Sequence, residues 1–301
     1  MSGAPALRLP ARAKLNLHLR VCGRRADGYH LLVTLFHALE LHDDLVVAPA
    51  AAGVELAVTA DAPAFTVSAG PDNLVCRALR AFAAAVPGAG FRARLHKRIP
   101  HGGGLGGGSS DAAAALRLAN ALHGEPLAAD QLAALAASLG ADCAFFLRGG
   151  SQWGRGVGDE LTPARVVPRH FVLVCPPFGC DTAAVYKTHA ALWRGGTQPD
   201  TVGGIPAVDE PEAVLHLGFR NDLWAAAAQV QPALAPLRQR VEALAGCAAA
   251  MTGSGSTLFV PFPVAEAAER CARDLAPLAG DGVRLVVTRS GPTVVDAPMP
   301  A

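Results

Sequence analysis

Two segments of the chain alternate apolar and polar residues with the period of two that is typical of a β-strand. In residues 13–21 the odd positions are apolar and the even positions polar, so Lys14 and Asn16 share one face of the predicted strand. Residues 91–99 alternate in the same way, but Lys97 falls on the apolar side. A charge at that position needs a partner or a ligand, unless its side chain extends to water at the strand end.

The rest of the pattern mixes helices and strands in both halves of the chain. We therefore predict an α+β fold with two domains, residues 1–165 and 166–301. The further predicted strands comprise residues 31–41, 44–48, 170–175 and 283–289, with one more ending near residue 260. The predicted helices comprise residues 73–86, 110–123, 128–139 and 264–277, a segment from about 182, and a long helical region from 221 continued by 232–246. Irregular segments are expected at residues 50–70 (a hairpin with connecting loops), 149–158 (a second glycine-rich loop) and 194–211 (a surface excursion).

A loop with six glycines lies in residues 102–108, between a predicted strand and a predicted helix. Glycine lets the backbone turn sharply and brings bare N–H groups close to a ligand. Ser109, Ser110 and Asp111 follow, and these residue types favour the start of a helix, as the alanines after them favour its continuation. A glycine loop that leads into a helix N-terminus predicts an anion site, most often for phosphate.

Several common uses of a glycine loop fit this pattern poorly. Gly102, Gly104 and Gly107 satisfy G-x-G-x-x-G, but Asp130 opens a further helix where a dinucleotide fold needs a strand with an acidic end. No lysine follows the glycines, which excludes the usual P-loop, and the protein-kinase motifs H-R-D and D-F-G do not occur. A flexible linker is rarely flanked by a strand and a long capped helix. We therefore predict a phosphate cradle of another kind.

The overall composition narrows the classes of function. Half of the 301 residues are apolar and the net charge is +1, which argues against a nucleic-acid binder that relies on bulk electrostatics. The chain has no apolar run of eighteen residues and no signal-peptide pattern, so we expect no membrane partner. Seven cysteines without a C-x-x-C pair suit buried thiols in a reducing compartment. A cytoplasmic protein is expected.

Lysine and one aspartate supply the candidate chemistry. Only Lys14, Lys97 and Lys187 are lysine among 26 basic residues. A chain that otherwise uses arginine can keep lysine where a compact ammonium is needed, although chance can also leave it there. Asp142 lies between a helix end and an apolar run. It can be a helix or turn cap, or a carboxylate in a pocket of low dielectric that acts as a base. Both interpretations stay open.

Taken together, three motifs resemble the signatures of the GHMP kinases: the glycine loop, residues 140–142 and residues 252–256. The chain is most similar to the branch of that family that acts on a cytidine diphosphate-linked methylerythritol in the non-mevalonate isoprenoid pathway. The matching segments spread over both expected domains and comprise residues 13–17, 25–30, 100–110, 140–142, 157–159 and 252–256. The resemblance implies a ribosomal protein S5 domain 2-like N-terminal domain and a ferredoxin-like C-terminal domain, with the substrate in the cleft between them.

The resemblance also implies a set of site residues and cofactors. ATP would be the phosphoryl donor, and Lys14 and Asp142 would be the catalytic pair, with Asp142 as the base for the acceptor hydroxyl. The nucleotide would be held by Lys97, Pro100, His101, Gly102, Gly103, Gly104, Leu105, Gly106, Gly107, Gly108, Ser109 and Ser110. The substrate would contact Asn16, Tyr29, His30, Thr182, Tyr186, Gly253 and Ser254, with the two tyrosine rings on either side of the cytosine. Mg²⁺ is expected with the ATP, and Ser109 or Ser110 is a candidate to hold it.

Two alternatives remain. The first is a GHMP kinase for another small alcohol, of the homoserine or mevalonate type, although Tyr29 and Tyr186 then have no obvious base to stack on. The second is a nucleotide-binding sensor without catalysis, against which the presence of both Lys14 and Asp142 argues. In each case we expect a small-molecule ligand, no nucleic-acid partner, and a monomer or weak homodimer.

Overall fold

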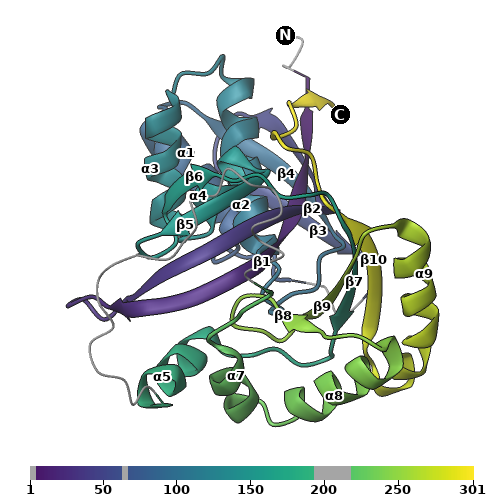
Figure 1. Ribbon diagram of the computed structural model, residues 1–301. Coiled ribbons are helices and arrows are strands. Elements are labelled where there is room, and N and C mark those ends of the chain that lie inside the picture. The colour runs from purple at the N-terminus through teal and green to yellow at the C-terminus, as the bar shows by residue number, and fades with distance from the viewer. Residues whose placement is uncertain (1–4, 63–66, 193–217) are drawn as a thin grey trace.

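The computed structural model describes residues 5–62, 67–192 and 218–301, and it contains two β-sheets with helices packed on each (Figure 1). The first sheet has the strand order β11-β1-β2-β4-β3, and β5 and β6 extend it from β2. Its strands are β1 (Leu7–Arg24), β2 (His30–Ala50), β3 (Val54–Ala60), β4 (Gly90–Lys97), β5 (Ser151–Arg155), β6 (Glu160–Pro163) and β11 (Met299–Pro300). The second sheet has the order β10-β7-β9-β8. Its strands are β7 (His170–Cys175), β8 (Ala250–Met251), β9 (Leu258–Phe262) and β10 (Arg284–Arg289).

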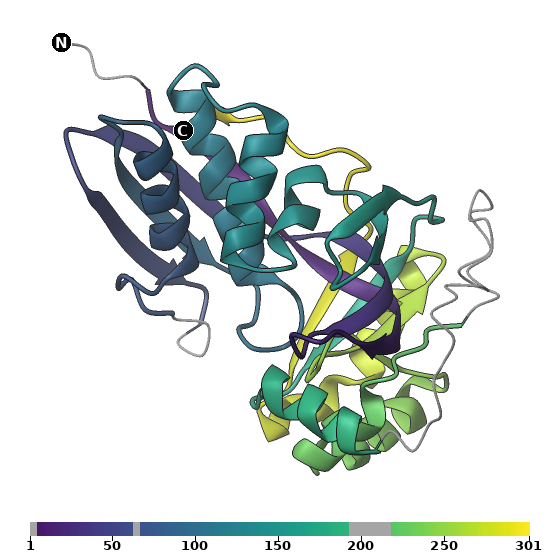
Figure 2. The same cartoon turned by 90° about the vertical axis from the view of Figure 1, so that its left-hand side faces the viewer.

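The helices divide between the two sheets in the same way, as Figure 2 shows from the side. The first group is α1 (Leu74–Ala85), α2 (Gly107–Leu122), α3 (Ala129–Leu139) and α4 (Cys143–Arg148). The second group is α5 (Thr182–Leu192), α7 (Trp224–Val230), α8 (Leu234–Ala245) and α9 (Ala265–Asp274), followed by a 3₁₀ turn over Ala276–Asp281. Among the described residues, no helix has both the length and the apolar character needed to cross a membrane.

The first strand, β1, packs against both halves of the molecule, and its alternating pattern determines which side chains do so. The apolar side chains of Leu15 and Leu17 are buried in one cluster with Phe171, Leu173 and Phe259 of the second sheet. Further along β1, the strand continues into the core of the second half, so the long β1–β2 hairpin spans both units (Figures 1 and 2). This packing leaves the polar face of β1 directed to the other side, as the period of two predicts.

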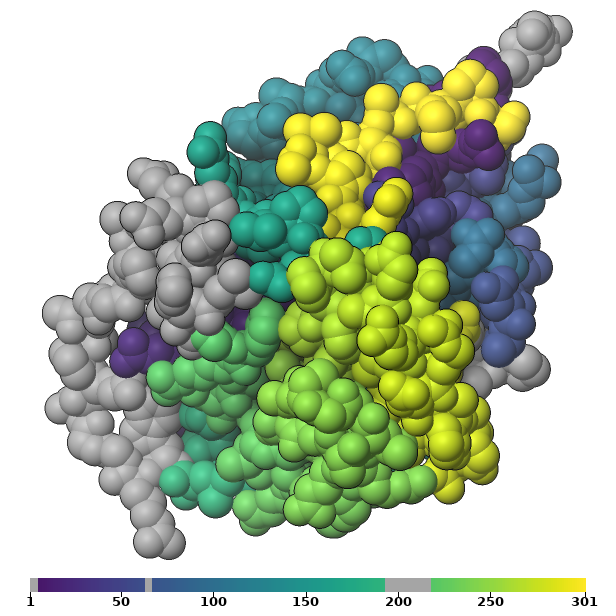
Figure 3. Space-filling view, turned by 45° about the vertical axis from the view of Figure 1, so that its right-hand side comes forward, coloured from purple at the N-terminus to yellow at the C-terminus, as the bar shows by residue number. Residues whose placement is uncertain are grey.

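The end of the chain returns to its beginning. The β11 strand pairs antiparallel with β1, and Arg12 binds the Asp296 carboxylate through two hydrogen bonds of 2.7 and 3.0 Å. Figure 3 shows these last residues, in yellow, lying beside the purple first strand. The expected division at residue 165 falls in the link between β6 and β7, but residues after β10 lie on the first half of the molecule. The sequence offered no signal for this return.

Several elements of the structure differ from those predicted. The strands expected at 31–41 and 44–48 are one strand, β2, because the acidic Asp43 between them is buried by an ion pair instead of ending the strand. Residues 50–70 include β3, which pairs parallel with β4. The loop expected at 149–158 contributes β5 and part of the β5–β6 hairpin. The helical region after 221 is two helices, and residues 194–211 lie outside the described part of the chain.

The most consequential difference concerns the start of α2. The helix begins at Gly107, after Gly106 in the left-handed conformation with a φ of 72°. Ser109, Ser110 and Asp111 therefore lie inside its first turns and do not cap it. Glycine carries no Cβ penalty at positive φ, so it can start the helix where a side-chain cap would otherwise be needed. As a result the N-terminal N–H groups of α2 belong to the glycine loop itself.

Candidate active site

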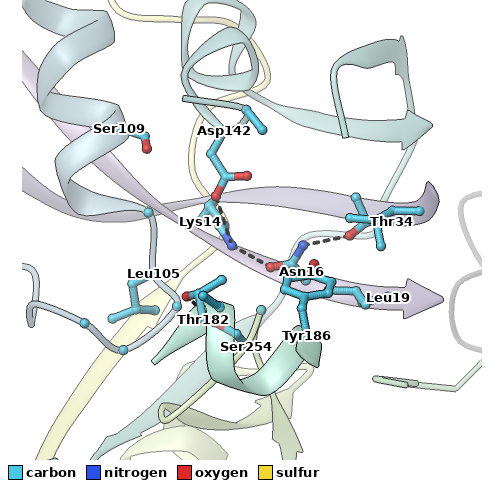
Figure 4. A pocket seen from close by; sticks show the side chains of 18 of the residues that line it. Lys14, Asn16, Leu19, Thr34, Leu105, Ser109, Asp142, Thr182, Tyr186 and Ser254 are labelled. Atoms are coloured by element: carbon cyan, nitrogen blue, oxygen red, sulfur yellow. Dashed lines mark hydrogen bonds and ion pairs between the residues drawn. The ribbon is translucent and has the colours of Figure 1, made fainter. Parts of the chain in front are cut away.

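A cavity of about 1130 Å³ lies where the glycine loop, the β1–β2 hairpin and α5 meet (Figure 4). It is lined by every residue that the sequence analysis proposed for the site except Ser110. These residues come from both halves of the molecule, since β1, the start of α2 and the turn before α4 line one side and α5 with Gly253 and Ser254 the other. The space is slightly larger than the roughly 300–1,000 Å³ that ligand pockets in proteins commonly have.

Lys14 and Asp142 form an ion pair in the wall of this cavity. The Lys14 ammonium lies 3.6 Å from Oδ2 of Asp142, and the side chain of Lys14 is almost fully buried while that of Asp142 is one third exposed. Figure 4 shows the carboxylate above the ammonium, with the open space beside both. Burial lowers the pKa of Lys14 from its usual value, and the nearby charge of Asp142 opposes that shift. The pair therefore combines a partly desolvated cation with a carboxylate that solvent or a ligand can reach.

The neighbouring polar residues fix the position of this ammonium. Lys14 donates to Oδ1 of Asn16 at 2.5 Å, and Nδ2 of Asn16 donates to Oγ1 of Thr34 at 2.7 Å. The backbone N–H of Asn16 donates to Oγ1 of Thr252 at 2.9 Å. The β1–β2 register shifts on both sides of this stretch, and such bulges redirect side chains near functional sites. Asn16 therefore orients Lys14, in addition to its expected place on the substrate side of the cavity.

Asp142 occupies the N-cap position of α4, but its side chain caps none of the described N–H groups of that helix. The interpretation of Asp142 as a structural cap is therefore wrong. The turn before it is closed by the backbone, since the N–H of Cys143 donates to the carbonyl of Gly140 at 3.1 Å. Because the backbone holds the turn, the carboxylate is free to point at Lys14.

The glycine loop is held open by contacts to its backbone. The N–H of Lys14 donates to the carbonyl of Leu105 at 2.9 Å, and the N–H of Thr257 donates to the carbonyl of Gly103 at 3.2 Å. A Cβ at Gly106 would lie 2.7 Å from the ring of Phe146 and 3.1 Å from Cγ of Lys14. These positions need glycine both for the positive φ and for the space, so the loop can present N–H groups toward the cavity as an anion site.

Aromatic and hydroxyl groups line the opposite end of the cavity. Tyr29 is exposed on the turn between β1 and β2, and the ring of His30 stacks on Tyr186 with their centroids 5.0 Å apart. Oγ1 of Thr182 and Oγ of Ser254 lie 2.8 Å apart, which joins the start of α5 to the loop after β8. Burial is the main cause that lowers the pKa of His30, with the neighbouring His189 and Arg24 adding to it. This end of the cavity therefore presents aromatic rings and hydroxyl groups.

Of the proposed nucleotide contacts, one has its charge already paired and another lies outside the cavity lining. The ammonium of Lys97 pairs with Asp43 and with Asp111, the latter at 2.7 Å, so its charge is already balanced by buried carboxylates. Ser110 is buried and does not line the cavity, and its N–H donates to the carbonyl of Gly106 at 2.9 Å within the helix. Because α2 begins at Gly107, its first turn lines the cavity with Gly107, Gly108 and Ser109.

Some residues of the site were not anticipated. Thr34 orients Asn16, Asp43 pairs with Lys97, and the side chains of Arg24 and Lys187 line the cavity. The scarcity of lysine was the available signal for Lys187, because all three lysines of the chain line this one cavity. Asp43 had a weaker signal, since it interrupts an apolar strand pattern where a buried charge needs a partner.

Comparisons with known proteins place these features in context. Residues 73–150 match the N-terminal domain of GHMP kinases, and residues 207–281 match the C-terminal domain of GHMP kinases. The chain is 39% identical to a 4-diphosphocytidyl-2-C-methyl-D-erythritol kinase of Salinispora tropica, over 97% of this chain and 93% of the relative. It is 40% identical to the kinase of the same name from Ralstonia nicotianae, over 91% of each chain.

Solved structures show the same similarity. A crystal structure of 4-(cytidine 5'-diphospho)-2C-methyl-D-erythritol kinase superimposes with a TM-score of 0.75 at 35% identity, covering 95% of this chain and all of the other. A homoserine kinase from Cytophaga hutchinsonii superimposes with a TM-score of 0.72 at 18% identity, covering 99% of this chain and 98% of the other. At that identity the second likeness concerns the fold alone.

The close approach of the glycine loop to the loop after β8 predicts the effect of a small side chain. Gly104 has a φ of +79°, and a Cβ there would lie 2.4 Å from the carbonyl oxygen of Thr252. We expect Gly104→Ala to lower the free energy of unfolding by about 3 kcal/mol, from the positive φ and the forced displacement together. Gly124 also has a positive φ, of +74°, but open space around it, so Gly124→Ala is the control, with an expected loss of about 1 kcal/mol. Urea unfolding of both variants measures the difference, and equal losses would contradict the close contact.

Proposed function

Because the chain belongs to the 4-diphosphocytidyl-2-C-methyl-D-erythritol kinases, a branch of the GHMP kinases, we propose that Lys14 and Asp142 form its catalytic pair and that the glycine loop holds the ATP phosphates. The protein uses ATP to phosphorylate the 2-hydroxyl of 4-diphosphocytidyl-2-C-methyl-D-erythritol, a step of the non-mevalonate route to isoprenoid precursors. The observation that carries the proposed roles is the 3.6 Å pair of Lys14 and Asp142 in the same cavity as the glycine loop.

Phosphoryl transfer mainly requires positioning of the reactants and neutralisation of charge. In our proposal the N–H groups at the start of α2 bind the phosphates, and the Lys14 ammonium stabilises negative charge that develops on the transferring group. The acceptor hydroxyl donates its proton to a carboxylate oxygen of Asp142 as the new O–P bond forms and the bond to ADP breaks. Asn16 holds Lys14 in place through its 2.5 Å hydrogen bond, so the ammonium needs little reorganisation during the step.

We propose that Mg²⁺ accompanies the ATP and contacts the hydroxyl of Ser109. This ion often takes most of its ligands from substrate phosphates and water, so one protein oxygen suits it. The Ser109 side chain lines the cavity in the first turn of α2, whereas Ser110 does not, which favours Ser109 of the two candidates. When bound, Mg²⁺ would neutralise charge on the phosphates.

For the alcohol substrate we propose that the cytosine lies between Tyr29 and Tyr186. Both rings line the cavity from different elements, the β1–β2 turn and α5, and His30 already stacks on one of them. Thr182 and Ser254 supply hydroxyl groups at the side of the same space. This arrangement gives the aromatic residues a purpose that a homoserine or mevalonate substrate would not use.

We also propose that the protein acts in the cytosol as a monomer or weak homodimer. All seven cysteines are free thiols, and five of them are buried. Thiols of this kind persist in a reducing compartment.

The role of Asp142 as the base predicts a loss of turnover with retained nucleotide binding. We expect Asp142→Asn to lower kcat by roughly 100-fold or more, in line with the contribution of a general base, while the KM for ATP changes little. Asp130→Asn is the matched control, because Asp130 is exposed on α3 and away from the cavity. Steady-state kinetics with the cytidylyl alcohol measure both, and near-normal kcat for Asp142→Asn would remove Asp142 from the mechanism.

The lowered pKa of Lys14 predicts the alkaline side of the pH profile. Lysine acts here in its protonated form, so kcat should fall as the pH rises through the pKa of Lys14. Since burial lowers that pKa, the fall should be centred below the usual lysine value of 10.5. Measurement of kcat between neutral pH and pH 10.5 tests this, with circular dichroism as a check that the protein stays folded. A rate that is constant over that range in folded protein would contradict the role of Lys14.

Stacking on the cytosine predicts a selective change in substrate affinity. We expect Tyr29→Ala to raise the KM for the cytidylyl alcohol by about 5- to 150-fold, the equivalent of about 1–3 kcal/mol for a base stacked on an aromatic ring. The KM for ATP should stay the same, and Tyr29→Phe, which keeps the ring, should behave like the unaltered protein. If Tyr29→Ala left the KM of the alcohol unchanged, the cytosine would have to bind elsewhere.

A further inference from the structure

A buried group of three charged residues lies beside the glycine loop and has no role in the chemistry described above. Asp43 comes from β2, Lys97 from the end of β4 and Asp111 from α2. The Lys97 ammonium donates to Oδ2 of Asp43 and, at 2.7 Å, to Oδ2 of Asp111. All three side chains are at most 4% exposed. Charges buried this deeply are retained only when their partners are well arranged, so each contact of the group constrains the backbone that carries it.

Asp43 also holds the beginning of the glycine loop. Its Oδ1 accepts hydrogen bonds from the backbone N–H groups of Arg98, at 2.5 Å, and Ile99, at 2.8 Å. With the ammonium of Lys97 on its other oxygen, this carboxylate binds three donors. Charge-assisted bonds to consecutive backbone N–H groups are strong and directional. The chain therefore enters the loop along a path set by Asp43.

Lys97 connects this entrance to the exit of the loop. Asp111 lies near the start of α2, so the ammonium between the two carboxylates links the residues before the glycines to the helix after them. Residues 102–108 carry only one side chain beyond hydrogen, that of Leu105. Glycine loses more conformational freedom on ordering than any other residue, so such a loop needs fixed ends to hold one shape before a ligand binds.

We propose that Asp43 and Lys97 are positioning residues that fix both ends of the glycine loop and thereby set the affinity for ATP. The inference rests on the proposed function, because the loop is taken to hold the ATP phosphates. Neither residue is assigned a part in the transfer step. The carboxylate of Asp43 is fully buried, and Lys97 reaches the cavity wall with its charge already paired.

The two carboxyl groups have unequal roles. Oδ1 of Asp111 is buried and has no hydrogen-bond partner among the described residues, whereas both oxygens of Asp43 accept bonds. Burial and the nearby Asp43 raise the pKa of Asp111 to about 8, with Lys97 opposing the shift. Because one oxygen of Asp111 accepts no hydrogen bond and burial disfavours its charged form, asparagine, which has the same shape, can replace it. Asp43 has no such neutral substitute.

The test compares three variants with the same substitution at different places. Asp43→Asn should raise both the dissociation constant of ATP, by calorimetry, and the KM for ATP by roughly 10- to 100-fold, the scale of a misplaced binding group. Its KM for the cytidylyl alcohol should stay within about twofold. Asp111→Asn should stay within about threefold of the unaltered protein for ATP. Asp44→Asn is the control, because Asp44 is the next residue of β2 but is half exposed and pairs with the side chain of Arg98.

Unchanged ATP affinity in folded Asp43→Asn would overturn the proposal, as would an equal rise in both KM values, which indicates general damage to the fold. If Asp43→Asn does not fold, the Asp43→Asn/Lys97→Met double variant removes both charges of the Asp43–Lys97 pair together, and it should show the same rise for ATP. Unchanged ATP affinity in that variant also overturns the proposal.

Calorimetry separates this inference from the proposed function. If the unaltered protein binds ATP but does not phosphorylate the alcohol, the proposed function is wrong. The comparison of ATP affinities among the variants then still tests this inference. Unaltered protein that does not bind ATP contradicts both.

Discussion

The arrangement of the site depends on the buried ammonium of Lys14. A charge removed from water costs several kcal/mol unless partners replace the lost solvation. Here the partners are the carboxylate of Asp142 at 3.6 Å and the amide oxygen of Asn16 at 2.5 Å. Asp142 lies more than 120 residues further along the chain, so the ammonium is stable only when β1 and the turn before α4 come together. The same requirement brings the proposed catalytic pair beside the start of α2.

The glycine loop meets a related requirement with backbone groups. Its carbonyls accept from Lys14 and Thr257, so the loop is attached to the first strand and to the second half of the molecule. Its entrance is attached to Asp43 through two N–H groups. Since these contacts use the backbone, the glycines are free to keep their positive φ values and their open face. The proposed phosphate site is therefore formed by three separate segments, and each of them also serves the packing of the fold.

The sequence was informative where a local pattern determines the outcome. The period of two placed Lys14 and Asn16 on one face of β1, and the run of glycines between a strand pattern and a helix pattern identified a loop that lines the cavity. Contacts between distant residues were not accessible in this way. Lys97 pairs with Asp43, 54 positions away, and with Asp111, and the sequence identified neither partner. Ser110 was misplaced because α2 begins after Gly106 without a side-chain cap, whereas serine is a typical cap residue. The pairing of β11 with β1 had no local signal either, since it involves two residues at the end of the chain.

The roles given to Lys14, Asp142 and the glycine loop can be checked together in a crystal structure of the protein with a non-hydrolysable ATP analogue and 4-diphosphocytidyl-2-C-methyl-D-erythritol. We expect the triphosphate to lie along residues 101–109 and the 2-hydroxyl oxygen to lie within about 3.2 Å of a carboxylate oxygen of Asp142, the reach of a proton transfer. We also expect the Lys14 ammonium to contact the γ-phosphate or the acceptor oxygen. A triphosphate bound outside the glycine loop, or a hydroxyl directed at a different acid or base, would contradict these roles.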